Sequence, residues 1–541
     1  MTLVFRPWPT LLLTAVLLPA AGLAQSTTAP PPVAAPQWHL LDPLTSPVQG
    51  ISADRTYQEL LAGRASAQVV VAVIDAGIDS VHQDLKRVLW KNTRELVGNG
   101  QDDDRNGYAD DVHGWSFLGG KDGRNVDVDT YEDTRLMARL KPLYAGKTRA
   151  KLKPAQQKEY DLYKKVEKTY QQKLTEATTN YQQYSALYGQ YGAGFDKIKQ
   201  ALGVPSLDTA TLRRVRATDP ELQNTATGLY ENLKAGGFAS TDALVAELKE
   251  YVDDLKSQLD YSLNLNFNPR PIVGDNYANV KERAYGNADM HGPDPSHGTH
   301  VAGIIGADRT NTLGVRGIAD NVLLMAVRAV PNGDERDKDI ANAIRYAVDN
   351  GAQIINMSFG KYYSPQRVAV EDAIRYAASK NVLLIHSAGN ESKDLDVETQ
   401  YISPRYLNGT VIPNMITVGA SAAEANERLA ADFSNYGKKS VDVFAPGVQI
   451  YSTLPGSTYG NKSGTSMAGP VVAGMAAVLK SYYPQLTAID LKRIILQSAV
   501  PNHTQVLRPG TKKTVDFAQL SSTGAIVNLY QAVLLAQKEA K

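Results

Sequence analysis

The stretch AQVVVAVIDAGID, residues 67–79, decides the fold class of this chain. Its apolar residues follow one another without the alternation of a half-exposed strand, and a small-residue turn ends the run. A continuous apolar run of this kind is typical of a strand buried on both faces within a parallel sheet. Asp75 lies at the carboxyl end of the predicted strand. Sites in open α/β sheets lie at that end.

Further apolar runs of the same character follow, and helical patterns lie between several of them. The predicted strands lie within residues 321–330, 352–360, 382–390, 415–421 and 441–447, and the predicted helices within 339–350 and 367–380. Alternation of strand and helix predicts an α/β fold with a doubly wound sheet. Ser358 and Asn390 then join Asp75 at the carboxyl ends of strands.

Length and charge narrow the classes of function. The 541 residues are enough for about two or three domains. Lys and Arg number 57 against 56 Asp and Glu, so the charge balance does not suggest binding to nucleic acid or to a membrane surface. The chain has no cysteine, so disulfides, cysteine nucleophiles and thiolate metal sites are excluded.

The N-terminus predicts export from the cytoplasm. Arg6 precedes an apolar run at residues 11–18, and Gly22 and Ala24 stand three and one positions before a cut at Gln25. This pattern is typical of a secretory signal peptide, here residues 1–24. A short membrane anchor is the alternative, but the run falls below the ~20 residues that span a bilayer. We therefore expect a secreted protein, extracellular or periplasmic, with a Pro/Ala-rich leader at residues 25–37 and no transmembrane segment in the mature chain.

The segment 130–266 differs from the rest because it is rich in Lys, Gln and Tyr. Two series at spacings of three and four, the first with Glu167 filling one gap, predict two amphipathic helices packed as a hairpin. They are Tyr160, Tyr163, Tyr170, Leu174, Ala177, Tyr181, Tyr184, Tyr188 and Tyr191, and then Leu244, Leu248, Tyr251, Leu255 and Leu259. Gly and Pro residues between Gly189 and Pro220 predict breaks. We interpret the tyrosine stripe as a helix–helix seam, with a ligand or partner surface as the alternative.

Three short stretches together predict hydrolytic chemistry. VIDAGIDSVHQDL carries Asp75, SHGTHVAGIIG carries His297, and GTSMAGPVVAG carries Ser466. Serine hydrolysis needs a hydroxyl nucleophile, an imidazole that takes its proton, and a carboxylate that orients the imidazole. If each residue is considered alone, a structural role is the alternative: Asp75 as a turn residue, and His297 and Ser466 as helix caps.

In the order Asp, His, Ser, the three stretches resemble those of the subtilisin-like serine proteases, the subtilases. The resemblance covers residues 38–120 and 273–536, and WHLLD with NGYADDVHGWSF is most similar to secreted subtilases of Bacteroidetes-type bacteria. It implies a three-layer, mostly parallel α/β fold. The catalytic domain would then comprise residues 38–129 and 267–541, interrupted by a helical insertion at 130–266.

The resemblance also implies roles for individual residues. Ser466 is expected to be the nucleophile, His297 the general base and acid, and Asp75 the orienting carboxylate. The amide of Asn390 would hold the oxyanion together with the Ser466 backbone N–H. Ser358, Phe359 and Gly360 would pair with extended substrate as an added strand.

We therefore expect a secreted serine endopeptidase that acts on proteins or peptides through an acyl-enzyme and needs no cofactor for its chemistry. A catalytically idle binding protein of the same fold is one alternative. An exopeptidase whose cleft the insertion restricts is another. The insertion is a candidate gate for substrate access or a surface that recruits a partner. Asp334, Glu335 and Asp337 could favour basic substrate residues, with a solvated acidic loop as the alternative.

Two calcium sites are expected as structural features. Asp102, Asp104, Asn106 and Asp110 alternate along DDDRNGYADD, with Gly107 at the turn, and this spacing suits Ca²⁺. A solvated acidic turn is the alternative, since His113 stands where an EF-hand has glutamate. The resemblance implies a second site at Asp84 and Asn311 with the carbonyls of Arg309, Leu313 and Val315. For that pair the alternative is a helix cap and a loop asparagine.

Overall fold

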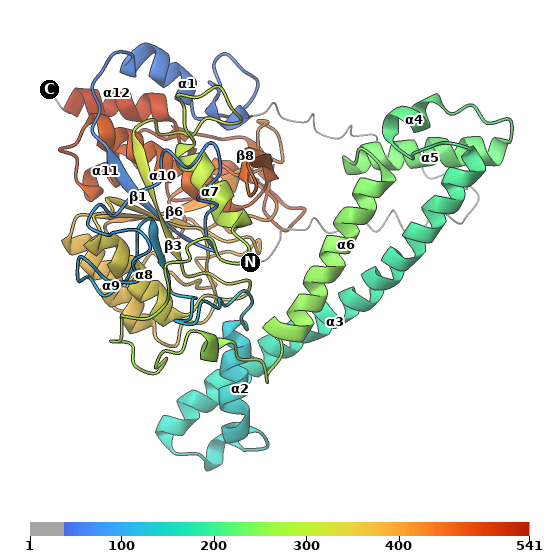
Figure 1. Ribbon diagram of the computed structural model, residues 1–541. Coiled ribbons are helices and arrows are strands. Elements are labelled where there is room, and N and C mark those ends of the chain that lie inside the picture. The colour runs from blue at the N-terminus through green and yellow to red at the C-terminus, as the bar shows by residue number, and fades with distance from the viewer. Residues whose placement is uncertain (1–36, 540–541) are drawn as a thin grey trace. The chain divides into compact units, whose positions relative to one another are not determined.

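A computed structural model of the protein describes residues 37–539 (Figure 1). The predicted signal peptide, and the predicted leader up to residue 36, lie outside the described residues. The described chain divides into two compact units. The first comprises residues 37–132 and 268–539, and the second comprises residues 133–267.

The first unit is built on a nine-stranded sheet, and the predicted α/β class is confirmed. The strand order is β10-β13-β7-β6-β5-β4-β1-β3-β2, and only the β10–β13 pair is antiparallel. The strands are β1 (Val69–Asp75), β2 (Gly114–Ser116), β3 (Val322–Arg328), β4 (Ile354–Met357), β5 (Leu383–Ser387), β6 (Met415–Ser421), β7 (Val443–Pro446), β10 (Val500–Pro501) and β13 (Ala525–Ile526).

The opening apolar run forms the middle of this sheet. β1 pairs with β3 from Val69–Val322 through Asp75–Arg328, and on its other side with β4. Six of its seven residues are buried because both faces of the sheet are covered. Asp75 therefore lies at the carboxyl end of a strand that neighbouring strands hold on both sides.

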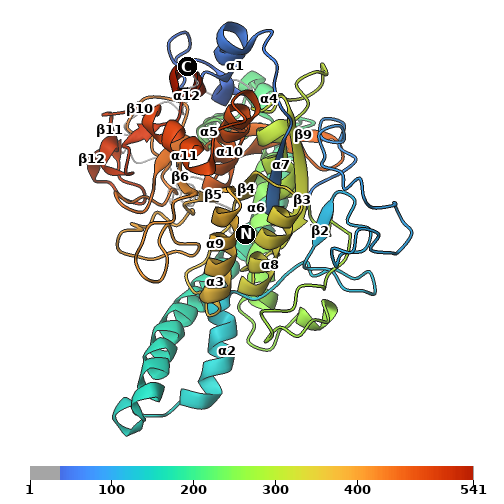
Figure 2. The same ribbon diagram turned by 90° about the vertical axis from the view of Figure 1, so that its left-hand side faces the viewer.

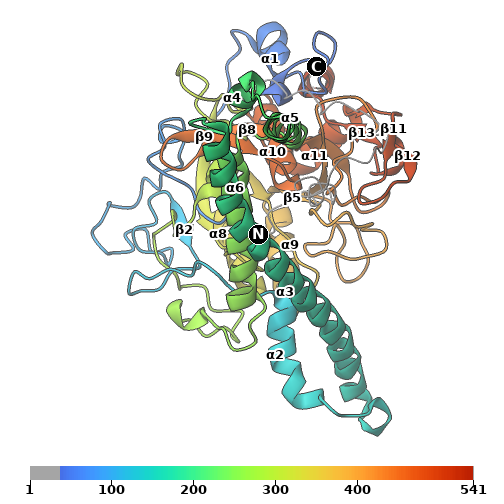
Figure 3. The same cartoon turned by 90° about the vertical axis from the view of Figure 1, so that its right-hand side faces the viewer.

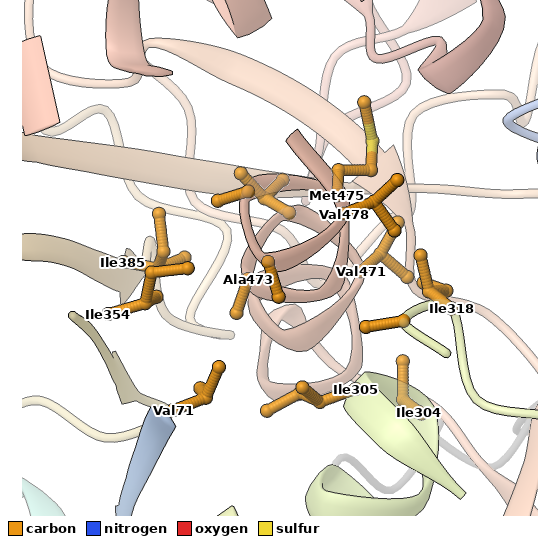
Figure 4. Close-up of a cluster of buried hydrophobic side chains, with 14 of the residues drawn as sticks. Val71, Ile304, Ile305, Ile318, Ile354, Ile385, Val471, Ala473, Met475 and Val478 are labelled. Atoms are coloured by element: carbon orange, nitrogen blue, oxygen red, sulfur yellow. The ribbon is translucent and has the colours of Figure 1, made fainter. Parts of the chain in front are cut away.

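Helices cover the sheet on two faces, which gives the three expected layers (Figure 2). One face packs against α7 (Ser296–Gly306), α10 (Thr465–Tyr482), α11 (Ala488–Gln497) and α12 (Leu529–Glu539). The other packs against α8 (Asp337–Asp349) and α9 (Arg367–Ser379). Figure 4 shows α10 at the centre of the first layer, among side chains of α7 and of strands β1, β4 and β5. Small pieces complete the unit: α1 (Ala53–Thr56) and the pairs β8 (Ile450–Leu454) with β9 (Thr458–Lys462) and β11 (Gln505–Leu507) with β12 (Thr514–Asp516).

The second unit is helical. It contains α3 (Pro154–Leu202), α4 (Thr209–Arg214), α5 (Pro220–Gly236), α6 (Thr241–Ser257) and all but the first residue of α2 (Glu132–Tyr144). α3 and α6 pack along each other (Figure 3). Leu187, Leu248 and Val252 form one seam between them, with partly buried tyrosines of the predicted stripe against it: Tyr181, Tyr184, Tyr188 and Tyr191.

The break predicted between Gly189 and Pro220 falls at Gly203. α3 continues through Gly189, Gly192 and Gly194 and ends only at Gly203, which has a left-handed φ of 62°. An internal glycine costs a helix only about 1 kcal/mol. Packing offsets that cost here, because Tyr191, Phe195, Ile198 and Leu202 lie against a buried cluster that includes Leu207 and Leu233. None of the helices within residues 37–539 is both long and apolar enough to span a bilayer.

Candidate active site

The end of β1 and the start of α7 bring Asp75 and His297 together. His297 Nδ1 lies 2.7 Å from Asp75 Oδ1, and both residues are buried. The position of Asp75 is fixed further by its backbone, because its carbonyl accepts from the N–H groups of Ala329 and Val330. A carboxylate at Nδ1 holds the imidazole so that Nε2 is the nitrogen left to accept a proton.

Ser466 lies in the first turn of α10, which packs against α7. Its hydroxyl donates to the carbonyl of Ser358 at 3.2 Å. Within the described residues it makes no hydrogen bond to His297. The structure therefore brings Asp75 and His297 into contact and places the serine hydroxyl on the edge segment that follows β4.

The hydroxyl of Ser358 supports the first turn of α10. Pro470 has no N–H, so it cannot donate to the carbonyl of Ser466 four residues earlier. Ser358 Oγ donates to that carbonyl instead, at 3.1 Å, and accepts from the amide of Asn356. Ser387 Oγ similarly donates to the carbonyl of Thr465. The sequence analysis did not predict these hydrogen bonds to the first turn of α10. The only sign of them in the sequence is that polar residues stand near the ends of two buried strands.

Asn390 lies beside the backbone of the same turn. Its Oδ1 accepts from Thr465 N at 2.8 Å and from Thr465 Oγ1 at 2.9 Å, which orients the side chain and leaves its amide nitrogen available. A methyl group placed on Gly464 would lie 3.6 Å from Ser466 N and 3.7 Å from Asn390 Nδ2. Two N–H donors thus border one small region at the start of a helix, where a developing oxyanion is favoured.

The segment 358–360 follows β4 directly. Phe359 O accepts from His386 Nε2 at 2.9 Å, and burial lowers the pKa of His386 to about 4, so this histidine is a neutral donor at ordinary pH. Lys361 exchanges two backbone hydrogen bonds with Tyr401, of 2.9 and 2.7 Å. The segment is therefore held from behind by a side chain and at its end by a short backbone ladder.

The alternative of a solvated acidic loop is wrong for two of its three residues. Glu335 and Asp337 are buried rather than solvated or open to substrate. Asp337 accepts from Lys361 at 2.8 Å, and Glu132 accepts from the same ammonium group at 2.9 Å. Asp334 accepts from the backbone N–H of Glu132. The sequence pattern could not reveal this because Lys361 and Glu132 lie far from the loop along the chain.

The first candidate metal site contains a carboxylate that the sequence analysis missed. Glu95 lies with Asp102 and Asp104, and the ligand oxygens of the three residues lie within 4.8 Å of one another. Glu95 is only 4% exposed, so the three like charges share a partly dry site that suits a hard cation. Asp110 is not part of this group, since it accepts from the N–H groups of residues 98–100. Asn106 lies nearby, and its backbone N–H donates to Asp102 and Asp104.

The second candidate pair also comes together. Asn311 Nδ2 lies 2.8 Å from Asp84 Oδ1, and the other oxygen of Asp84 accepts from Val315 N and the Tyr459 hydroxyl. Asp84 is fully buried. The oxygen-rich set suits calcium, but hydrogen bonds alone also satisfy this carboxylate here.

Comparison with known proteins gives a match over most of the chain. The model of the family described as "Subtilase family" matches residues 66–525. The thermophilic serine proteinase of Bacillus sp. (strain AK1) is 42% identical over 205 residues, which are 38% of this chain and 47% of that protein. Subtilisin E of Bacillus subtilis (strain 168) is 40% identical over 198 residues, 36% of this chain and 49% of that protein. The chain thus spans about half the length of these curated relatives. A solved structure titled "Proteases from Pseudoalteromonas arctica PAMC 21717" is 27% identical, with coverage of 46% of this chain and 78% of that one and a TM-score of 0.38.

Proposed function

Because the chain belongs to the subtilase family, we propose that it is a secreted serine endopeptidase that cleaves protein or peptide substrates through an acyl-enzyme. The observation that carries this proposal is the 2.7 Å contact between His297 Nδ1 and Asp75 Oδ1, beside the helix that begins with Thr465 and Ser466. Binding without chemistry would not require a buried carboxylate on this imidazole.

In the proposed reaction Ser466 Oγ turns from the Ser358 carbonyl toward His297 Nε2. The imidazole takes the hydroxyl proton as the oxygen attacks the scissile carbonyl carbon, and Asp75 stabilises the imidazolium that forms. His297 then gives the proton to the leaving amine, so that the peptide C–N bond breaks and an ester to Ser466 remains. Water attacks that ester with the same base, which releases the acid and restores the hydroxyl.

The negative charge of the tetrahedral intermediate falls on the former carbonyl oxygen. Asn390 Nδ2 and Ser466 N are its proposed donors, because both border the region beside Gly464. Thr465 holds the oxygen end of the Asn390 amide, so the nitrogen end is oriented before substrate arrives. Such preorganised donors stabilise the transition state without reorganisation during the reaction.

Extended substrate is proposed to lie along residues 358–360 as an additional strand, with its backbone paired to this edge. Two structural calcium ions are proposed, one held by Glu95, Asp102 and Asp104 and the other by Asp84 and Asn311. They neutralise clustered carboxylates and take no part in the chemistry.

The helical unit is proposed to gate access of large substrates. Deletion of about residues 130–266 should then raise turnover of a folded protein more than turnover of a tripeptide, and an equal change in both would contradict gating.

Cleavage mapping tests the proposed activity. The mature protein, expected to begin at Gln25 after secretion, is incubated with a long peptide blocked at both ends, and the products are identified by mass spectrometry. Internal cuts that are absent with Ser466→Ala are the expected result. Products only from unblocked ends of a matched peptide would indicate an exopeptidase, and no products from either peptide would overturn the proposal.

A further inference from the structure

A buried lysine follows directly after the proposed substrate-binding edge, residues 358–360. Lys361 is only 3% exposed. Its Nζ donates to Glu132 Oε2 at 2.9 Å and to the carbonyl of Glu335 at 2.7 Å, and it lies 2.8 Å from Asp337 Oδ1. Three oxygen atoms thus surround an ammonium group that has three hydrogens. The side chain of Lys361 is therefore held as firmly as its backbone, which pairs with Tyr401.

One of these three oxygens comes from the root of the helical insertion, by which we mean residues 129–132. Glu132 is the last residue of the first unit and the first residue of α2, whose other residues belong to the helical unit. It is 3% exposed, and its backbone N–H donates to Asp334 Oδ2 at 2.8 Å. The insertion thus begins at a residue whose carboxylate ends on the lysine beside the edge.

A second buried ion pair holds the same root at another point. The two carboxylate oxygens of Asp129 accept from Arg336 at 2.7 and 3.0 Å, and both residues are buried. Asp129 N also donates to the carbonyl of Asn332 at 2.9 Å. This pair joins the root to the residue before α8, whereas Glu132 joins it to the residue after Gly360.

The edge has few hydrogen bonds of its own at Gly360. Neither the N–H nor the carbonyl of this glycine makes a hydrogen bond to another of residues 37–539, so both are available to an extended peptide. The position of Gly360 then depends on its two neighbours. Phe359 is held through its carbonyl, which accepts from His386, and Lys361 is held through its ammonium group.

We propose that Glu132 is a positioning residue, which acts through Lys361 to hold residues 358–360 in place for pairing with the substrate backbone. This inference rests on the proposed endopeptidase function. A buried ammonium hydrogen without an acceptor is unfavourable, so loss of the Glu132 carboxylate favours movement of Lys361 and weakens binding of peptides that pair with the edge. Lys361 and Asp337 remain a neutral ion pair in that case, so no buried charge is left without a partner.

Near-isosteric substitutions of Glu132 separate positioning from packing. Glu132→Met removes the acceptor, and Glu132→Gln keeps one. kcat and KM are measured on two anilides that share the residue before the scissile bond, chosen by the cleavage mapping: a tetrapeptide, which can pair with the edge, and that residue alone with an acetyl group. Glu132→Met should raise the tetrapeptide KM about tenfold, with little change in kcat or in kcat/KM of the shorter anilide. Glu132→Gln should resemble the natural protein.

Asp129→Leu is the matched control, because it breaks the neighbouring ion pair of the root and leaves Glu132 in place. It should lower the midpoint of thermal unfolding and keep the tetrapeptide KM of the natural protein. A tetrapeptide KM that stays at the natural value in Glu132→Met, or that rises equally in Asp129→Leu, would overturn the positioning role.

A second measurement does not depend on activity. In the Ser466→Ala background, Glu132→Met should accelerate amide hydrogen exchange of Lys361, whose N–H donates to Tyr401, and leave that of β1 unchanged. Glu132→Gln should not accelerate it. Natural protein that hydrolyses neither anilide speaks against the endopeptidase function, and unchanged exchange of Lys361 in Glu132→Met overturns the role of Glu132 by itself.

Discussion

Asn390 is the residue whose geometry bears most directly on rate. Thr465 binds its side-chain oxygen through both a backbone N–H and a hydroxyl, so the amide has one orientation, with the nitrogen toward the region beside Gly464. Asn390 could be predicted as a candidate site residue from the sequence because it lies at the carboxyl end of a buried strand. The role of that amide as an oxyanion donor remains a prediction.

Replacing Asn390 by aspartate tests that role. The variant keeps an acceptor for Thr465 and loses the N–H donor, so kcat should fall while KM changes little. The expected loss is about 100- to 1,000-fold, which is the magnitude measured for an oxyanion donor of subtilisin itself. Thr465→Val is the matched control, since it removes one bond that orients the amide and should cost much less. An equal loss in both variants would contradict a donor role.

Glu95 shows what sequence reasoning could not supply at this scale. It lies neither in a motif nor at the end of a predicted element. It reaches Asp102 and Asp104 only because the loop that carries them folds back beside it. The sequence could predict the candidate catalytic residues Asp75, His297 and Ser466, because the end of a buried strand and the start of a helix can be recognised from residue patterns.

At the scale of elements, apolar runs correctly predicted the strands. Charged stretches did not correctly predict which residues are exposed to solvent. β1 and β3–β7 lie within the predicted runs because burial on both faces requires continuous apolar residues. The start of α8 was expected to be open, yet its acidic residues are buried by ion pairs with distant cations: Asp337 with Lys361, and Asp339 with Arg270. A charge pattern does not reveal its partners, so this burial could not be predicted.

The loop with Glu95, Asp102 and Asp104 yields a prediction at the same scale. Ca²⁺ should raise the midpoint of thermal unfolding, and chelation should lower it; binding at 100 times the Kd contributes about 2.7 kcal/mol. Glu95→Gln keeps an acceptor for nearby N–H groups and removes a charge, so it should weaken the Ca²⁺ effect. Asp84→Asn tests the second pair in the same way. An unfolding midpoint that is identical with Ca²⁺ and with chelator would refute both sites.

At the scale of the whole molecule, the core contains three histidines that stay neutral. Burial and then Arg316 lower the pKa of His39 to about 3, burial and then Lys462 lower that of His300 to about 3, and burial lowers that of His386 to about 4. In the unfolded chain these three histidines bind protons as the pH falls below about 6.5. In the folded chain they stay neutral until the pH is much lower. The stability from these groups is therefore complete above pH 6.5 and is lost as pH falls toward 4.

The lowered pKa values of these buried histidines predict that the free energy of unfolding falls markedly in acid. Between pH 6.5 and 5 each histidine should lower the free energy of unfolding by about 2 kcal/mol. Denaturant unfolding of Ser466→Ala, which cannot digest itself, measures the slope against pH. His386→Gln retains a donor for Phe359 O and does not titrate, so its slope should be shallower. A free energy of unfolding that stays constant over this range in both proteins would contradict the linkage.

Covalent labelling of Ser466 tests the central claim most directly. A fluorophosphonate reacts with a serine only where a base activates the hydroxyl and donors hold the oxyanion, which is the arrangement proposed for Asp75, His297, Ser466 and Asn390. We predict one label per molecule, mapped to Ser466 by mass spectrometry, retained in Ser463→Ala and lost in Ser466→Ala and His297→Ala. Absence of label on the natural protein, or label that persists in Ser466→Ala, would contradict the proposed serine protease chemistry.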